Sequence, residues 1–213
     1  MESKPERNKK TRNQQAQDTE RLILNQTMRL FLEKGYHGTS INDITEAVGL
    51  TKGAIYWHFK SKEDLLLRVM EEYETRFLDG LIRAVGEVPG KALDKFEKFN
   101  RYNAAFGYYN RELCVSFTTL AAELFGTGHG VESEIRRIYR KYQDFIAKMI
   151  SEGKKEKVFR KDLNPALTAL LIMALHDGML LQWSMNRDKV DGEAFVNTSR
   201  KVLLNGIFSF QKE

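Results

Sequence analysis

Apolar residues recur every three or four positions along most of the chain, which is the spacing of one buried face of an α-helix. Leu22, Ile23 and Leu30 mark such a face over residues 18–34, and Gly35 ends that helix. The same spacing, with only three prolines in the sequence, predicts an all-α fold. The remaining long helices are predicted over residues 62–85, around 96–106, and over 113–125, 131–153, 166–185 and 192–210.

A stretch near the amino terminus, residues 39–62, holds two short helices around a tight turn. Ser40 is placed to cap the first helix, and Asp43, three residues later, completes a carboxylate version of the capping box. Gly49 ends that helix with the left-handed conformation that a sharp turn needs. Thr51 can then cap the second helix, so the pattern predicts a helix-turn-helix.

The second of these helices presents an unusual outer face. Ile55 and Phe59 lie four residues apart and should face the core, which turns a lysine, a glycine and two large aromatic residues outward. A glycine beside a lysine lets the first turn approach base edges in the major groove, while Tyr56, His58 and Lys62 can hold phosphates. The alternative is an ordinary helical hairpin with exposed aromatic side chains. The predicted DNA contacts are Thr39, Ser40, Thr51, Lys52, Gly53, Tyr56, Trp57, His58 and Lys62.

The run that begins at Gly35, GYHGTSINDITEAVGLTKGAIYWHFKSKEDLL, resembles the amino-terminal DNA-binding domain of the TetR family of bacterial repressors. The resemblance covers residues 18–73, and its most specific part is TKGAIYWHFKSKEDLL. It implies a three-helix DNA-binding domain that a long helix joins to an all-helical body for ligand binding and dimerisation. Beyond residue 73 the family diverges, so the resemblance does not identify a ligand.

The expected organisation has three parts: a flexible basic arm (1–16), the helix-turn-helix domain (17–62) and the helical body (63–213). The arm carries five basic residues against two acidic ones and has almost no apolar residue, so it should be disordered alone. It can lie along DNA or serve only as a solubilising tail. The net charge of +5 permits an anionic partner without identifying it.

No catalytic, cofactor or metal site is predicted. The glycine-rich stretch 126–130 lacks the Gly-Lys-Ser/Thr ending of a phosphate-binding loop, and the four histidines form no ligand pair at helical spacing. Cys114, the single cysteine, is predicted to be a buried, inert thiol. Residues 166–185 are apolar enough to suggest a membrane span, but a central Asp177 would cost about 2.5 to 3.5 kcal/mol there. We therefore expect a cytoplasmic protein without a membrane-spanning helix and without enzymatic activity.

The two carboxy-terminal helices carry more apolar surface than one small helical bundle can bury. The resemblance implies that they pair with the same two helices of a second subunit in a four-helix interface. Two recognition helices related by a twofold axis would then read a palindromic operator. The predicted interface residues are Leu171, Ala174, Gly178, Val202, Leu203, Ile207 and Phe210.

Two functions of different class remain. The favoured one is a homodimeric repressor that a small, largely hydrophobic or amphiphilic effector releases from its operator. The other is an architectural DNA-binding protein whose helical body binds protein partners, and a real cavity in the body would separate the two. Basic residues outnumber acidic ones ten to five over 131–161. This excess can indicate an anionic effector, such as a fatty acyl thioester, but a solvated helix face is the favoured explanation. The predicted ligand contacts are Asn103, Phe106, Phe117, Leu120, Met173 and Asp177.

Overall fold

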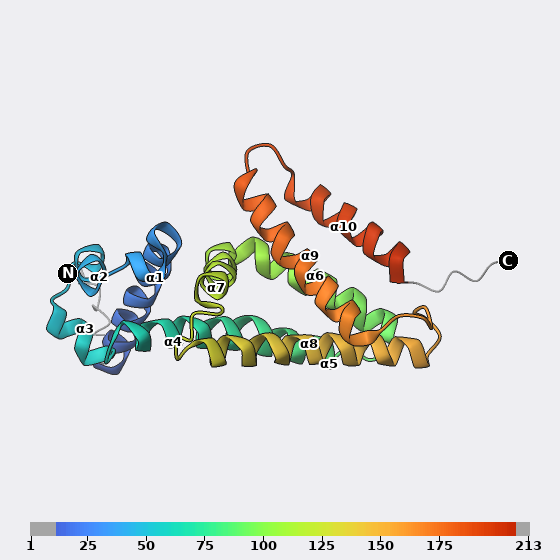
Figure 1. The fold of residues 1–213 in the computed structure, drawn as a ribbon, viewed down its shortest axis with the longest axis horizontal. Helices are drawn as coiled ribbons and strands as arrows, with labels where there is room; N and C mark the ends of the chain where they lie inside the picture. Colours follow the sequence, from blue (N-terminus) through green and yellow to red (C-terminus); the bar gives the residue numbers. More distant parts are fainter. Residues whose placement is uncertain (1–11, 208–213) are drawn as a thin grey trace, which may run out of the picture.

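The computed structural model describes residues 12–207, and each element in that range is helical, as the periodicity predicts (Figure 1). The elements are α1 (Arg12–Gly38), α2 (Ile41–Val48), α3 (Lys52–His58), α4 (Lys62–Tyr73), η1 (Glu74–Asp79), α5 (Gly80–Gly86), α6 (Ala92–Tyr109), α7 (Arg111–Leu124), α8 (Glu132–Lys155), α9 (Pro165–Met185) and α10 (Gly192–Ile207).

Helices α1 to α3 form a head at one end of the molecule (Figure 1). Ile23, Ile44, Ile55 and Leu65 are each fully buried there, so every helix of the head and the start of α4 contribute to one core. Helix α1 begins at Arg12, which makes residues 12–16 helical where the sequence predicts a flexible arm. The rest of that arm, 1–11, lies outside the described residues.

A continuous rod of α4, η1 and α5 leaves the head and runs through the body beside α8 (Figure 1). The sequence predicts one helix over this range, whereas the structure contains a π-helical segment at Glu74–Asp79. Lys141 of α8 donates to Glu74 and to Asp79, each at 2.6 Å, and Arg137 also pairs with Glu74. These cations lower the pKa of Glu74 to about 2 and tie the π segment to α8.

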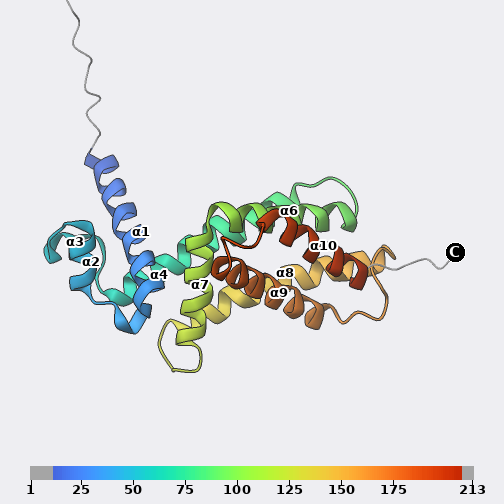
Figure 2. The same cartoon turned by 90° about the horizontal axis from the view of Figure 1, so that it is seen from above.

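In the body, α6, α7 and α8 pack against the rod, and α9 packs against α7 and α8 (Figure 2). Its core is aromatic: Phe96, Phe99 and Phe117 are at most 2% exposed, and the Phe117 ring stacks on Tyr73 of the rod with centroids 3.7 Å apart. Helix α7 crosses between the two parts and also packs against α1. The body is therefore in direct contact with the head through α7 as well as through the rod.

Helices α9 and α10 are only partly buried against the rest of the body. Asn164 caps α9 and Pro165 occupies its first turn, as predicted. Only 17% of the most apolar 18-residue window of α9 is buried, and by length and composition alone this helix could cross a membrane. Leu171 on α9 and Val202 on α10 are 66% and 67% exposed. The chain thus leaves an apolar surface on both of its last helices.

Candidate DNA-binding head and effector cavities

Short-range side-chain caps fix the two helices of the head's helix-turn-helix. Ser40 Oγ accepts the Asp43 N–H at 3.2 Å and Asp43 Oδ2 accepts the Ser40 N–H at 2.8 Å, which confirms the capping box. Lys34 also bonds Asp43, and chiefly this contact holds the pKa of that carboxyl far below its ordinary value. Gly49 has φ 68°, and Thr51 Oγ1 accepts the Ala54 N–H at 3.2 Å. The turn between the helices is therefore fixed from both sides.

The outward face of α3 is as the spacing predicts. Ile55 is fully buried, Tyr56 and Trp57 are 51% and 70% exposed, and the His58 ring packs edge-on against Trp57 at 4.5 Å. Lys52 and Gly53 are exposed beside them. The head therefore presents a cation, a bare backbone and two aromatic rings on one surface.

Two predicted DNA contacts have a different role in the structure. Thr39 is only 2% exposed, and its hydroxyl donates to Gly35 O at 2.8 Å, so its side chain is engaged inside the head; its contact with DNA stays a prediction. Lys62 Nζ donates to Tyr36 O at 2.8 Å and to Thr39 O at 2.9 Å, and it lies over the Tyr36 ring. Lys62 thus holds the α1–α2 junction and has one further N–H with which to contact phosphate.

A carboxylate of the body grips the same junction. Glu123 of α7 accepts the Tyr36 N–H at 2.8 Å and the His37 N–H at 2.9 Å, one on each oxygen. Gly35, at φ 73°, makes the bend that exposes these two N–H groups, and a Cβ there would lie 3.0 Å from a Glu123 oxygen. No pattern in the sequence identifies this contact, because 86 residues separate Glu123 from His37.

One cavity in the body, the larger cavity, has a volume of about 660 Å³, and residues of the rod and of α6 to α10 line it. On its wall the Tyr142 hydroxyl donates to Asn103 Oδ1 at 2.9 Å and lies 3.1 Å from His176 Nδ1. A phenol has one proton, so His176 donates in the second bond and is protonated on Nδ1. Burial lowers its pKa to about 4, so the ring is neutral.

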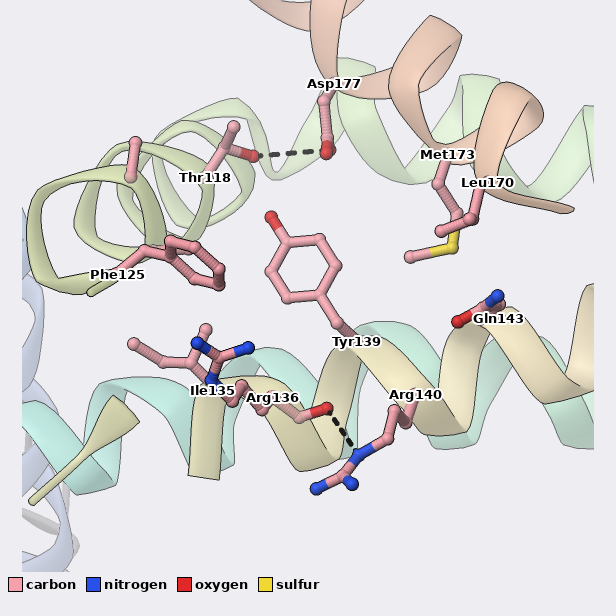
Figure 3. Close-up of a pocket in the computed structure, with 12 residues that line it drawn as sticks. Thr118, Phe125, Ile135, Arg136, Tyr139, Arg140, Gln143, Leu170, Met173 and Asp177 are labelled. Atoms are coloured by element: carbon pink, nitrogen blue, oxygen red, sulfur yellow. Dashed lines mark hydrogen bonds between the residues drawn. The ribbon is translucent and has the colours of Figure 1, made fainter. Parts of the chain in front are cut away.

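A smaller cavity of about 590 Å³ lies between α7, α8 and α9 (Figure 3). Arg136 and Arg140 lie at its α8 side, and Arg136 pairs with Glu132 at 2.6 Å while it covers the Phe125 ring. Thr118 and Asp177 line both cavities, so these two residues form part of the wall between them.

Three of the six predicted ligand contacts line a cavity. Asn103 lines the larger one, Met173 the smaller one, and Asp177 lines both. Phe106, Phe117 and Leu120 do not, because their side chains fill the core: Leu120 is fully buried, and Phe106 packs against the Phe77 ring at 5.2 Å. Sequence reasoning missed Tyr139 and Trp183, and only the neighbouring His176 and Asp177 of an apolar helix pointed toward this region.

The predicted dimer contacts divide between surface and core. Leu171, Ala174, Gly178 and Val202 are exposed. Leu203 is 8% exposed because it packs inside its own body, and its place in a dimer interface stays a prediction. The side chain of Ile207 and the whole of Phe210 lie outside the described part of the chain.

Four of the ten basic residues over 131–161 form ion pairs on the surface. Arg136, Arg137, Lys141 and Arg160 each contact a carboxylate. This arrangement agrees with the preferred interpretation, a solvated helix face. Among residues 12–207, no three His, Cys, Asp or Glu side chains lie close enough to share a metal ion.

Comparison with known proteins gives two family matches, one over residues of the head and the start of the rod and one over residues of the body. Residues 23–69 match the family described as bacterial regulatory proteins, tetR family, and residues 94–206 match the one described as YsiA-like protein, C-terminal region. The chain belongs to the TetR family. It is a transcriptional regulator with a helix-turn-helix DNA-binding domain, and regulators of this family are not enzymes.

Three relatives show how far the similarity extends. The MbdR regulator from Azoarcus sp. CIB is 30% identical, with a TM-score of 0.81 over 90% of this chain and all of that one. The HTH-type transcriptional regulator AcrR of Shigella flexneri is 27% identical over 80% of each chain. FadR from Bacillus subtilis, solved in complex with stearoyl-CoA, is 23% identical, with a TM-score of 0.73 over 88% of this chain and 98% of that one.

Proposed function

We propose that this TetR-family protein is a homodimeric repressor that a small, largely hydrophobic effector releases from a palindromic operator. The observation that carries the proposal is the position of the rod. Its first turns, at Leu65 and Leu66, belong to the buried core next to the head, while Tyr73 and Phe77 line the larger cavity. A ligand that shifts the rod at the cavity therefore shifts the head as well.

Dimerisation is supported by the exposed apolar surface of α9 and α10. Soluble monomers rarely leave several large apolar side chains exposed along one helix, as Leu167, Leu170 and Leu171 are here. A twofold pairing of these helices buries that surface and places two heads on one duplex. The remaining candidate DNA contacts, led by Lys52 and Tyr56, then face one half-site each.

Effector binding is supported by the two cavities, whose volumes lie in the range of small-molecule sites. FadR, which shares the fold, was solved with stearoyl-CoA. Cavities of this size favour a repressor over an architectural protein whose body serves only protein partners. A repressor of this kind works in the cytoplasm, on the DNA that it controls.

The test begins with selection of duplexes from a random pool by the full-length protein. A palindromic consensus, bound by a species that light scattering shows to be a dimer, is the expected result. A monomer at micromolar concentration, or binding without sequence preference, would overturn the repressor proposal in favour of the architectural one.

A further inference from the structure

The wall between the two cavities contains an acid without a counter-ion. Asp177 of α9 makes no ion pair within residues 12–207; its polar neighbours are the Thr118 hydroxyl, 3.5 Å from Oδ1, and the Tyr139 hydroxyl, which points toward the same place (Figure 3). Both neighbours are neutral. A carboxylate in such a site lacks the compensation that buried charges usually have.

The other ionisable groups around Asp177 are also neutral near pH 7. Burial raises the pKa of the Cys114 thiol to about 12 and raises those of Tyr139 and Tyr142, while it lowers the pKa of His176 to about 4. None of them supplies a positive charge to balance the acid. The interior of the larger cavity therefore has a negative potential centred on one residue.

Aromatic rings surround the same cavity. Tyr73 and Phe77 come from the rod, and Tyr108 of α6 stacks with Trp183 of α9 at a centroid distance of 5.8 Å. The faces of such rings carry negative charge density, so they attract a cation as well as an apolar body. The walls and the acid thus favour the same kind of ligand.

The charges at the rims separate the two cavities further. Beside α10 the larger cavity has Asp191 and Glu193, and its one guanidinium, Arg200, pairs with Glu97 at 3.4 Å. Two further arginines, Arg136 and Arg140, line the smaller cavity. An anionic ligand in the larger cavity would meet acids at the rim and again at Asp177.

We propose that the larger cavity binds a lipophilic organic cation, with its positive group at the Asp177 carboxylate and its apolar body against the aromatic walls. This inference rests on the proposed function, in which the body holds the effector. It contradicts the sequence-based suggestion of an anionic amphiphile, for this cavity. The protein as a whole is basic, so the cation preference is a local property of the site.

The sequence supplies a direct reporter. It contains two tryptophans, one on the recognition helix and one in this cavity, so Trp57→Phe leaves Trp183 as the single indole. Its fluorescence is titrated with tetraphenylphosphonium and with tetraphenylborate, which have nearly the same shape and opposite charge. We expect the phosphonium to bind about tenfold or more tightly than the borate.

Asp177→Asn in the same background should weaken phosphonium binding about tenfold and leave borate binding unchanged or stronger. The matched control is Asp144→Asn, which removes the same charge from an exposed site on α8 and should change neither. Thermal melts establish that both variants are folded. Equal affinity for the two ions, or phosphonium binding that Asp177→Asn leaves intact, would overturn the cation site.

Wild-type protein on its selected operator separates this inference from the proposed function. Release of the operator by phosphonium supports both. Phosphonium binding without release would leave the cation site standing and overturn its role as an effector site. Preference for the borate, lost on Arg136→Gln, would place an anionic ligand in the smaller cavity and overturn the cation inference while the repressor proposal survives.

Discussion

The contacts that stabilise the helix-turn-helix of the head and those that shape the cavity of the body join residues at different separations along the chain. In the head, caps join residues three positions apart, such as Ser40 with Asp43 and Thr51 with Ala54. In the body, the polar contacts that shape the larger cavity join Tyr142 to Asn103 and His176, across 39 and 34 residues. A local arrangement can keep its geometry while the sequence elsewhere changes, whereas a long-range one depends on every helix that it joins. The geometry of the helix-turn-helix therefore depends mainly on nearby residues, whereas the geometry of the larger cavity depends on how distant helices pack.

The largest expected effect comes from removing the proposed contact between the bodies of two subunits. Val202→Glu places a charge on the exposed apolar face of α10 and should give monomers. Operator affinity should fall about 100-fold or more although the head is untouched. In a dimer, binding of one head holds the second head at a high effective concentration near the other half-site, and a monomer lacks this advantage. Light scattering and operator titration measure both changes.

Lys201→Gln, at the neighbouring exposed position, is the control for Val202→Glu and should keep the dimer. A dimeric Val202→Glu protein with normal operator affinity would show that the α10 face is not part of the interface.

The next effect tests the contact that joins the two regions. Glu123→Gln replaces one acceptor oxygen with an amide that faces a backbone N–H, so one of the two bonds to Tyr36 and His37 is lost. The cost of about 1 to 2 kcal/mol should appear as roughly tenfold weaker operator binding. Hydrogen exchange at the Tyr36 and His37 amides should also quicken.

Glu112→Gln makes the same change at an exposed position of α7 and should alter neither quantity. Unchanged amide exchange in Glu123→Gln would mean that the head holds its junction without help from the body.

A change confined to the head should alter which sequence is read. Lys52 is exposed in the first turn of α3, so Lys52→Ala should relax preference at one base position by about 1 to 3 kcal/mol. Selection with the variant measures this, and dimerisation and thermal stability should stay as in the wild type. If the variant returns the parental operator with the same stringency, Lys52 is not a base contact.

The smallest expected effect is on stability and comes from the body. Burial raises the pKa of Asp177 to about 6, above its usual value near 3.9, so the folded state holds this proton more tightly than the unfolded state. The group's stabilising contribution is therefore complete below about pH 4 and is lost as pH rises through about 6.

Asp177→Asn cannot ionise, so at pH 8 its free energy of unfolding should exceed that of the wild type by about 1 kcal/mol. This figure is smaller than the full pKa shift implies, because the site borders open cavities where solvent screens the charge. The difference should vanish near about pH 4. Denaturant titrations across this range measure it, and a constant difference at every pH would contradict the raised pKa.

Particular residues show what the sequence could and could not predict. Ser40, Gly49 and Thr51 act within their own turn, so their roles follow from residue type and position. Thr39 looks the same in sequence, but its burial depends on where the chain bends at Gly35, which the pattern does not specify. The fold class and the family were predictable for the same reason as the caps.

The body was predictable as helices and not as a site. Apolar periodicity identifies Phe117, Leu120 and Met173 as inward-facing, yet only Met173 borders a cavity, because which inward residues leave a space depends on packing between distant helices. Glu123 resembles any surface acid of an amphipathic helix until α7 is placed against α1. Leu203 is buried and its neighbour Val202 is exposed, and only the position of α10 on the body determines which of the two faces solvent.

The π segment of the rod contains one residue more per turn than the α-helices on either side of it. A rod that tightened at 74–79 into regular α-helix would therefore turn its head-side half by about 100° and shift it by about 1.5 Å relative to its body-side half. Phe77, inside that segment, borders the larger cavity, and Lys141 clamps both ends of the segment through Glu74 and Asp79. The proposed effector, if it pressed on Phe77, would act at the one segment where a change of helix type rotates the two halves of the rod relative to each other.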